Sequence, residues 1–439
     1  MNNLFSKKAY LALFAGIFVL EAVLSLWTGN EYDMTVWFNT GKWMQQGINI
    51  YMPDNHVGYL PLWPLWCDIS YRVFVFSASN LELWRLTIKL PLIISHLALA
   101  FALGDFASNR FDRQTARKLF LVALTFSFFI FIGAMWGQIN TLSALLTFLA
   151  FYSLTKKRIA ISSLLLGVAV TLKIYPLVVL PAFFVYVLRE KNVKEAAKLA
   201  ILTIAIPIVF TAIFFLTFQW DMTYLFRTIF YWAPFYEANP AQILGGCMNI
   251  WSFISVLGVD VSQSWPLRIV WIPVLFAAFV YWLRKRQTSE ETLCLSVITL
   301  YGLFMITYAW IPEQTLVDPL PFILLQTIAF HPRKIYSYIL VIIQILVYAF
   351  SATNWGPFVL SPLLEKFFPA GLAAISGFSP SNQYIWVARG VLGLAVSLTL
   401  GVFLLSLIKP SIVEKVKNKI LLRKCDNNPK KSLLQNSSP

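Results

Sequence analysis

The chain has 439 residues, of which 58% are hydrophobic and only 13% charged, and its mean hydropathy is +0.68. This composition excludes an ordinary soluble domain, in which roughly 45–50% of residues are apolar. The formal net charge of +15 would favour nucleic acid as a partner of a soluble protein, but in a membrane protein it marks the loops that face the cytoplasm. We therefore expect a membrane protein with no nucleic-acid partner.

Long apolar runs follow one another along the chain. Lys7 and Lys8 precede the first run, and no small-residue cleavage site follows it, so we expect a retained span rather than a signal peptide. Lipid offers no hydrogen-bond partners, so each spanning run must be helical, and the sequence predicts an all-α, polytopic bundle of about twelve spans. The runs lie at residues 9–27, 86–104, 119–135, 139–155, 159–172, 174–188, 197–218, 266–283, 292–311, 316–331, 335–351 and 386–408.

Lys and Arg are concentrated in alternate connecting segments of this bundle. Placing the N-terminus inside puts most of them on the cytoplasmic side, which is the positive-inside bias. Both termini are then cytoplasmic, and residues 28–85, 219–265 and 352–385 form long outer loops with interfacial helices. The predicted transmembrane module covers residues 1–408. Residues 409–439 form a basic tail, which starts as an amphipathic helix on anionic lipid and ends in disorder.

The first outer loop begins with two carboxylates, Glu31 and Asp33. Apolar residues recur at near-helical spacing from Met34 to Ile48, which predicts a helix lying on the membrane with Asp33 at bilayer-surface height. Two carboxylates at this spacing can bind a divalent cation, Mg²⁺ or Mn²⁺, or provide a general base whose pKa the second carboxylate tunes. Helix capping by Asp33 is the structural alternative.

Three tight hairpins also turn on the outer side, and we expect their tips to meet above the bundle. The tips carry Gln138 and Asn140 in the first hairpin, Lys173 in the second, and Glu313, Gln314 and Asp318 in the third. Within the first outer loop, His56 beside Asp54 is a candidate acid or base, although a lone histidine is usually a surface hydrogen-bonding group.

The four cysteines lack the spacing of a metal site or a redox motif. Cys67 and Cys247 both fall in outer loops, so they are the one pair that could form a disulfide. We favour free, buried thiols, because lone cysteines usually behave as small hydrophobic residues.

The outer segments resemble the GT-C glycosyltransferases, membrane enzymes that take sugars from polyprenyl phosphate. Residues 136–140 (WGQIN) and 167–176 (GVAVTLKIYP) carry the likeness, and the second is similar to the first mannosyltransferase of glycosylphosphatidylinositol synthesis and to its bacterial and archaeal relatives. The resemblance covers about residues 28–190 and is weaker at residues 312–314. In the first outer loop it rests on Asp33, Trp37, Gly41, Gly47, Tyr51 and Tyr59-x-Pro61-Leu62.

The resemblance implies transfer of a hexose, mannose first, from a polyprenyl (dolichyl) phosphate donor to a lipid or glycan acceptor on the outer face, with inversion. The family's loop carries an acidic pair, often Asp-x-Asp, or a single Asp. Glu31 departs from that pattern, so the role of general base transfers to Asp33. The mixed likeness favours a prokaryotic, archaeal-type plasma membrane over the endoplasmic reticulum.

The leaving phosphate needs a cation. Lys173 is the first candidate, because an ammonium at the end of a span is costly unless it meets an anion or reaches the interface; snorkelling is the alternative. Arg227 and Arg389 are further candidates for the same role.

Polar side chains in the loop and at the hairpin tips would bind the sugar. Trp37, Trp63 and Trp136 would stack on the sugar or the prenyl chain, with interfacial anchoring as the alternative. The candidates for substrate hydrogen bonds are Gln138, Asn140, Glu313, Gln314, His56 and Tyr59.

A secondary transporter of about twelve spans is the competing function. It is disfavoured because no internal repeat relates residues 1–218 to residues 219–439, and because polar residues gather at the outer rim rather than at mid-bilayer. A flippase, or a lipid-linked polymerase or ligase, shares the lipid substrate. The acidic first loop favours a transferase over these.

Overall fold

The computed structural model confirms an all-helical membrane bundle. All regular secondary structure in the part of the chain that it describes is helical. The described residues are 7–52, 55, 57–226, 247–259, 269–285, 288–309, 311–354, 356–369 and 383–409.

Seven helical segments among the described residues are long and apolar enough to cross a membrane. They are α1 (Lys7–Trp27), α4 (Leu81–Ser108), the segment made of α5 (Arg113–Thr125), α6 (Ser127–Ile130) and η2 (Phe131–Trp136), α10 (Val193–Phe218), α16 (Glu290–Thr307), α18 (Lys334–Ala352) and α21 (Gln383–Ile408). Large apolar side chains such as Ile201, Ile208 and Leu216 of α10 are exposed, as expected for a surface that contacts lipid.

The remaining predicted spans are short helices. They correspond to α7 (Asn140–Thr155), α8 (Ile159–Leu172), α9 (Leu180–Glu190), α15 (Trp271–Arg284) and α17 (Leu320–Leu325), the last continued by η6 (Gln326–Phe330). Of these, α8 and α7 match their predicted runs to within one residue, and the other three begin several residues later than predicted. Prolines explain part of these later starts. A short 3₁₀ helix, η3 (Tyr175–Val179), carries Pro176 and precedes α9, whose own Pro181 lies in the first turn, the position that a helix tolerates best.

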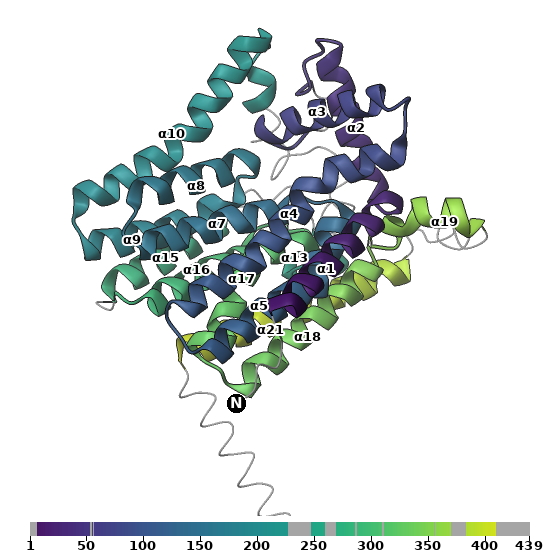
Figure 1. Ribbon diagram of the computed structural model, residues 1–439. Helices are drawn as coiled ribbons and strands as arrows, with labels where there is room; N and C mark the ends of the chain where they lie inside the picture. Colours follow the sequence, from purple (N-terminus) through teal and green to yellow (C-terminus); the bar gives the residue numbers. More distant parts are fainter. Residues whose placement is uncertain are drawn as a thin grey trace, which may run out of the picture.

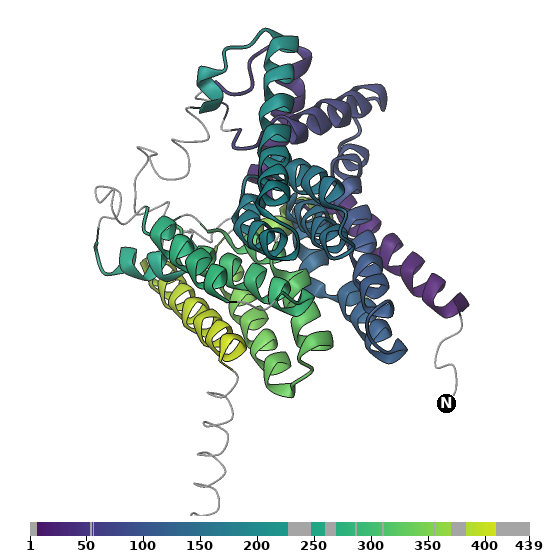
Figure 2. The ribbon, with the colours of Figure 1, turned by 90° about the vertical axis from the view of Figure 1, so that its left-hand side faces the viewer.

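The helices form two groups that lie side by side, as Figure 2 shows. In the first group, α4 packs against α1, α5 and α7, and α8 lies between α7 and α10. In the second group, α21 packs against α16, α18 and α13 (Ile250–Val256). The start of α1 and the end of α21 lie at the lower end of the molecule in Figure 1, whereas α2 (Glu31–Gln45) and α3 (Leu62–Phe76) lie at its upper end.

The helix predicted to lie on the membrane is α2, and it packs directly on α3. A Cβ atom added at Gly41 would lie 2.4 Å from the backbone oxygen of Cys67, so only glycine permits this approach. Met34, Trp37 and Met44 are buried, as the spacing predicted, but Ile48 lies beyond the helix and is exposed. Cys67 and Cys294 are buried free thiols, and the buried Cys247 donates from Sγ to the carbonyl oxygen of Ala309 at 2.8 Å, whereas Cys425 lies outside the described residues.

Candidate active site

Asp33 lies in the first turn of α2, but it does not cap the helix. The N-cap is Asn30, whose side-chain oxygen accepts a hydrogen bond from the Asp33 backbone N–H at 3.2 Å. The Asp33 carboxylate is therefore available for other contacts. Its Oδ2 atom accepts a hydrogen bond of 2.7 Å from the indole Nε1 of Trp136, far away in the sequence.

The backbone around Asp33 is tied to the end of η2. The backbone N–H of Asn30 donates to the backbone carbonyl oxygen of Trp136 at 3.2 Å. Gly137 then turns the chain with a φ of +97°, a conformation that favours glycine. A Cβ at Gly137 would lie 2.7 Å from Cε, the flexible end of the Met34 side chain on α2, so the turn lies close to α2. The end of α1 and the start of α2 (residues 25–34) thus contact the end of η2 and the turn after it (residues 132–138), and we call this contact the joint.

Gln138 and Tyr59 complete the surroundings of Asp33. The Tyr59 hydroxyl donates to Oε1 of Gln138 at 3.3 Å, and Gln138 also hydrogen-bonds to the Asp33 carboxylate. Burial raises the pKa of Asp33, and the hydrogen bonds from Trp136 and Gln138 together with the charge of Lys173 oppose that rise. The result is a carboxylate that is a stronger base than an exposed aspartate.

Lys173 follows the end of α8 in extended backbone and points into the same cluster. Its ammonium donates to Oδ1 of Asn140 at 3.0 Å and lies 4.8 Å from the ring centre of Tyr175. Burial lowers the pKa of Lys173 to about 8, although the negative charges of Asp318 and Asp33 oppose the shift. The hairpin tips that carry Asn140 and Lys173 therefore meet, as the sequence analysis expected.

Asp318 belongs to this cluster, and the sequence analysis did not assign it a site role. Its Oδ2 atom accepts a hydrogen bond of 2.7 Å from Nδ2 of Asn140, so Asn140 bridges Asp318 and Lys173. Both Asn140 and Asp318 are fully buried. The available signal was a carboxylate within the apolar run 316–331, because an ionisable residue in such a run is a functional candidate.

A second cluster lies at the neighbouring tip, in η5 (Glu313–Val317). Nδ2 of Asn354 donates to Oε2 of the buried Glu313 at 3.1 Å. Burial raises the pKa of Glu313 to about 7, and the hydrogen bond from Asn354 and the charge of Arg389 oppose the rise. Arg389 itself is buried and donates two hydrogen bonds to the carbonyl oxygen of Thr353, at 3.1 and 2.6 Å. Its guanidinium thus caps the end of α18.

The tryptophans predicted to stack on the substrate are placed differently from one another. Trp37 and Trp63 are buried and pack edge to face, with ring centres 5.0 Å apart, so they stabilise the loop rather than present an open face. Trp136 is also buried, but it contributes its indole N–H to Asp33.

Other predicted residues do not join the cluster. Glu31 is exposed, Gln314 lies next to Glu313 in η5 and is half-buried, and His56 and Arg227 lie outside the described residues. Among the residues that the structure describes, no group of three or more His, Cys, Asp and Glu side chains gathers to hold a metal ion. Asp33 is hydrogen-bonded to Trp136 and Gln138 and lies near the Lys173 cation, and the Asp318 carboxylate of the same cluster is hydrogen-bonded to Asn140, so these residues do not fit a divalent metal.

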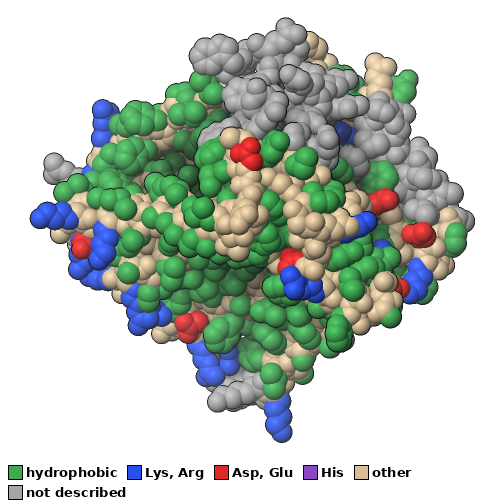
Figure 3. Space-filling view, turned by 90° about the horizontal axis from the view of Figure 1, so that it is seen from above, with side chains coloured by type: hydrophobic (Ala, Val, Ile, Leu, Met, Phe, Trp, Pro, Cys, Tyr) green, Lys and Arg blue, Asp and Glu red, His purple; other side chains and the backbone are tan. Residues whose placement is uncertain are grey.

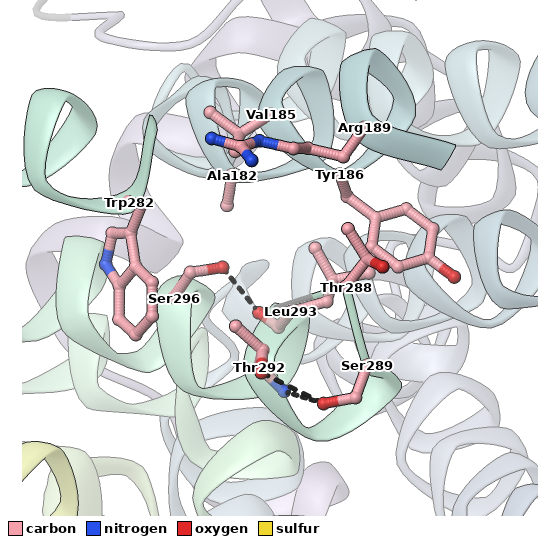
Figure 4. A pocket seen from close by; sticks show the side chains of 10 residues that line it. All are labelled: Ala182, Val185, Tyr186, Arg189, Trp282, Thr288, Ser289, Thr292, Leu293 and Ser296. Carbon is pink, nitrogen blue, oxygen red and sulfur yellow. Dashed lines mark hydrogen bonds between the residues drawn. The ribbon is translucent and has the colours of Figure 1, made fainter. Parts of the chain in front are cut away.

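A pocket lies elsewhere, between α9, α15 and α16 (Figure 4). Arg189, Trp282 and the hydroxyl-bearing Ser289, Thr292 and Ser296 are among the residues that line it. None of the site residues predicted from the sequence lines this pocket. Seen from above, the described surface of the molecule is largely hydrophobic, and most charged side chains lie toward its margin (Figure 3).

More than half of the chain matches the model of a known glycosyltransferase family. The family model of glycosyltransferase family 87 matches residues 60–307, more than half of the chain. The matched range includes Gln138, Asn140 and Lys173, whereas Asp33 precedes it and Glu313 follows it. A search of the curated proteins found no match. With its helical membrane bundle and this match, the chain belongs to glycosyltransferase family 87.

Proposed function

We propose that this membrane glycosyltransferase transfers a hexose, with mannose as the first candidate, from a polyprenyl-phosphate donor to a hydroxyl group of a lipid or glycan acceptor. The observation that carries the proposal is the convergence of Asp33 and Lys173 in one buried cluster. The opposite charges of Asp33 and Lys173 shift each other's pKa, and each group is hydrogen-bonded to an amide side chain, Asp33 to Gln138 and Lys173 to Asn140.

The reaction proposed is a single inverting displacement. The acceptor hydroxyl loses its proton to the Asp33 carboxylate while its oxygen forms a bond to the anomeric carbon of the sugar. The bond from that carbon to the phosphate oxygen breaks, and its electron pair stays on the polyprenyl phosphate. Burial favours both parts, because it makes Asp33 a better base and strengthens the attraction between Lys173 and the phosphate.

The sugar hydroxyls would be held near η5. Oδ1 of Asn354 and Oε1 of Gln314 are buried and lack a hydrogen-bond partner among the described residues. A buried acceptor without a donor is costly, and the hydroxyl groups of a sugar would satisfy both atoms. Glu313, with a pKa of about 7, would either donate to or accept from a further hydroxyl.

The proposed location of the reaction is the outer face of a prokaryotic plasma membrane. The cation-rich links between helices put the two termini inside under the positive-inside rule. The start of α1 and the end of α21 share one end of the molecule, and α2, which carries Asp33, lies toward the other (Figure 1). The exposed apolar side chains of α10 would face lipid between these ends.

A transfer assay with the purified protein in lipid nanodiscs tests the function. A panel of radiolabelled polyprenyl-phosphate sugars is supplied together with a lipid extract as acceptor, and the labelled product is separated by chromatography. We expect one donor to yield product with the wild type and none to do so with Asp33→Asn. Glu31→Gln is the matched control, because Glu31 is in the same helical turn but exposed, and it should retain activity.

Two outcomes would overturn the proposal. Full turnover by Asp33→Asn would remove Asp33 as the base. Movement of an unchanged labelled solute or lipid across the membrane of proteoliposomes, with no new glycosidic bond, would instead identify a transporter or a flippase.

A further inference from the structure

Lys89 is a completely buried lysine within the membrane span α4, and the proposed reaction does not use it. Its side chain has no exposed surface. Burying an ammonium in the hydrocarbon region is costly, and such residues are retained where they have a specific role. The contacts of Lys89 indicate what that role is.

Three backbone carbonyl groups converge on the Lys89 side chain. Nζ donates to the carbonyl oxygens of Thr28 at 2.6 Å, of Met135 at 3.0 Å and of Ser25 at 3.3 Å. Carbonyl oxygens only accept hydrogen bonds, so three of them require three N–H donors, which an ammonium has and a neutral amine lacks. The geometry therefore fits a charged Lys89 whose three hydrogens are all used.

These carbonyls belong to the two segments that build the joint around Asp33. Ser25 and Thr28 are at the C-terminal end of α1, where carbonyls without helical partners carry partial negative charge. Met135 lies in η2, next to Trp136. The helices α1 and α4 are packed against each other (Figure 1), and from α4 the Lys89 side chain contacts both segments.

The same joint carries the backbone and side-chain contacts of the site. The Asn30 amide donates to the Trp136 carbonyl, and the Trp136 indole donates to Asp33. The lysine stem also supports the turn at Gly137, where an added Cβ would lie 3.1 Å from Cε of Lys89. A single side chain thus contacts both halves of the joint and the turn that follows it.

We propose that Lys89 is a positioning residue that fixes the end of α1 to the end of η2 and so holds the Trp136 indole against Asp33. It does not touch the substrate. Its effect on sugar transfer rests on the function proposed above, but its effect on the joint does not.

Hydrogen–deuterium exchange measured by mass spectrometry tests the joint without reference to activity. The full-length protein in nanodiscs is compared with Lys89→Met, which keeps the apolar stem and removes the donors. Exchange in peptides covering residues 27–34 and 132–138 should become about 10- to 100-fold faster, the factor expected for losing charged hydrogen bonds. Lys42→Met, which removes an exposed lysine from α2, is the control and should leave these peptides unchanged.

A pH profile of transfer separates positioning from simple stability. In Lys89→Met, kcat should fall about tenfold or more while KM for the donor stays within about twofold, since binding groups remain in place. The acid limb of the profile should move to higher pH, because the hydrogen bond from Trp136 that opposes the raised pKa of Asp33 is lost. Trp136→Phe should give the same displacement, and the double variant should show no further displacement.

The outcomes decide between the hypotheses. Unchanged exchange at the joint in folded Lys89→Met would overturn the positioning role, as would an acid limb that stays in place while that of Trp136→Phe moves. If Lys89→Met does not fold, Lys89→Gln keeps two N–H donors and should show intermediate exchange; wild-type exchange in that variant would overturn the proposal. If the proposed function is wrong, the wild-type protein transfers no sugar, and this result is independent of the exchange measured at the joint.

Discussion

Two sets of charged side chains, the Arg110–Glu290 pair and the Asp33 and Lys173 groups, differ in whether the opposite charges contact each other. At the end of α4 that points away from α2, Arg110 forms a direct ion pair with Glu290 and stacks on the Phe106 ring, 4.2 Å from its centre. In the part of the chain that the structure describes, no ion pair joins Asp33 to Lys173; each is hydrogen-bonded to an uncharged side chain instead.

The difference indicates which charges are available to a ligand. The Arg110–Glu290 pair satisfies itself, so it contributes to packing and has no unmet electrostatic demand. Asp33 is hydrogen-bonded to Trp136 and Gln138, and Lys173 to Asn140, so in the proposed reaction an acceptor hydroxyl could still bind Asp33 and a phosphate could still bind Lys173. Substitutions in the two sets should therefore have opposite consequences for activity and for stability.

The largest effect is expected from removal of the base. Asp33→Asn should lower kcat about 10²- to 10⁴-fold, the contribution of a positioned general base, without lowering the amount of folded protein. Radiometric transfer assays on detergent-purified protein measure kcat, and size-exclusion chromatography measures folding. A comparable loss of folded protein would show that Asp33, like Arg110, is mainly structural.

Removal of the cation should affect donor binding. Lys173→Met should raise KM for the polyprenyl-phosphate donor about 10- to 100-fold, because a charge-assisted hydrogen bond to phosphate is lost. KM for the acceptor should change much less. A rise in the acceptor KM alone would show that Lys173 contributes to binding of the acceptor rather than of the donor phosphate.

The wild-type pH dependence tests the same assignment with a smaller effect. A lysine with a pKa of about 8 is about nine-tenths charged at pH 7 and about one-tenth charged at pH 9, so kcat/KM should fall as pH rises through 8. It should also fall on the acid side, as Asp33 becomes protonated, at a higher pH than for an exposed aspartate. Lys173→Arg stays charged throughout and should remove the alkaline limb. An unchanged limb in that variant would assign it to another group.

The smallest effect is expected at the other end of α4. Arg110→Met should lower the free energy of unfolding by about 1 kcal/mol or less, because both partners are partly exposed to solvent. Turnover should stay within about twofold of the wild type. Chemical denaturation followed by tryptophan fluorescence measures the first, and the transfer assay measures the second. A large loss of turnover would remove the distinction between the two sets of charges.

The helical class could be predicted from the sequence because it depends on local patterns. Hydropathy gave the spans, and the acidic start of α2 directed attention to Asp33. The hairpin tips were predicted to meet because alternate links lie on the same side of the membrane. In each case the signal is contained in neighbouring residues or in the parity of the spans.

The contacts around Asp33 and Asp318 depend on tertiary packing, which the local sequence pattern does not contain. Asn30 rather than Asp33 caps α2, and the Trp136 indole reaches Asp33, only because the end of η2 packs against the start of α2. Asp318 lies at the start of an apolar run in the sequence, and only tertiary packing places it, fully buried, beside Asn140. Glu31, two residues before Asp33, faces outward because the helical period separates the two carboxylates.

The close approach at Gly41 has a mechanical consequence. Because the backbones of α2 and α3 touch there, the two helices should move as one plate rather than as two independent segments. The height of Asp33 in the bilayer is then set by the apolar surface of both helices together. We expect a thinner or thicker membrane to shift this plate as a whole, so that lipid chain length would alter how often acceptor and donor meet without changing the joint that holds the base.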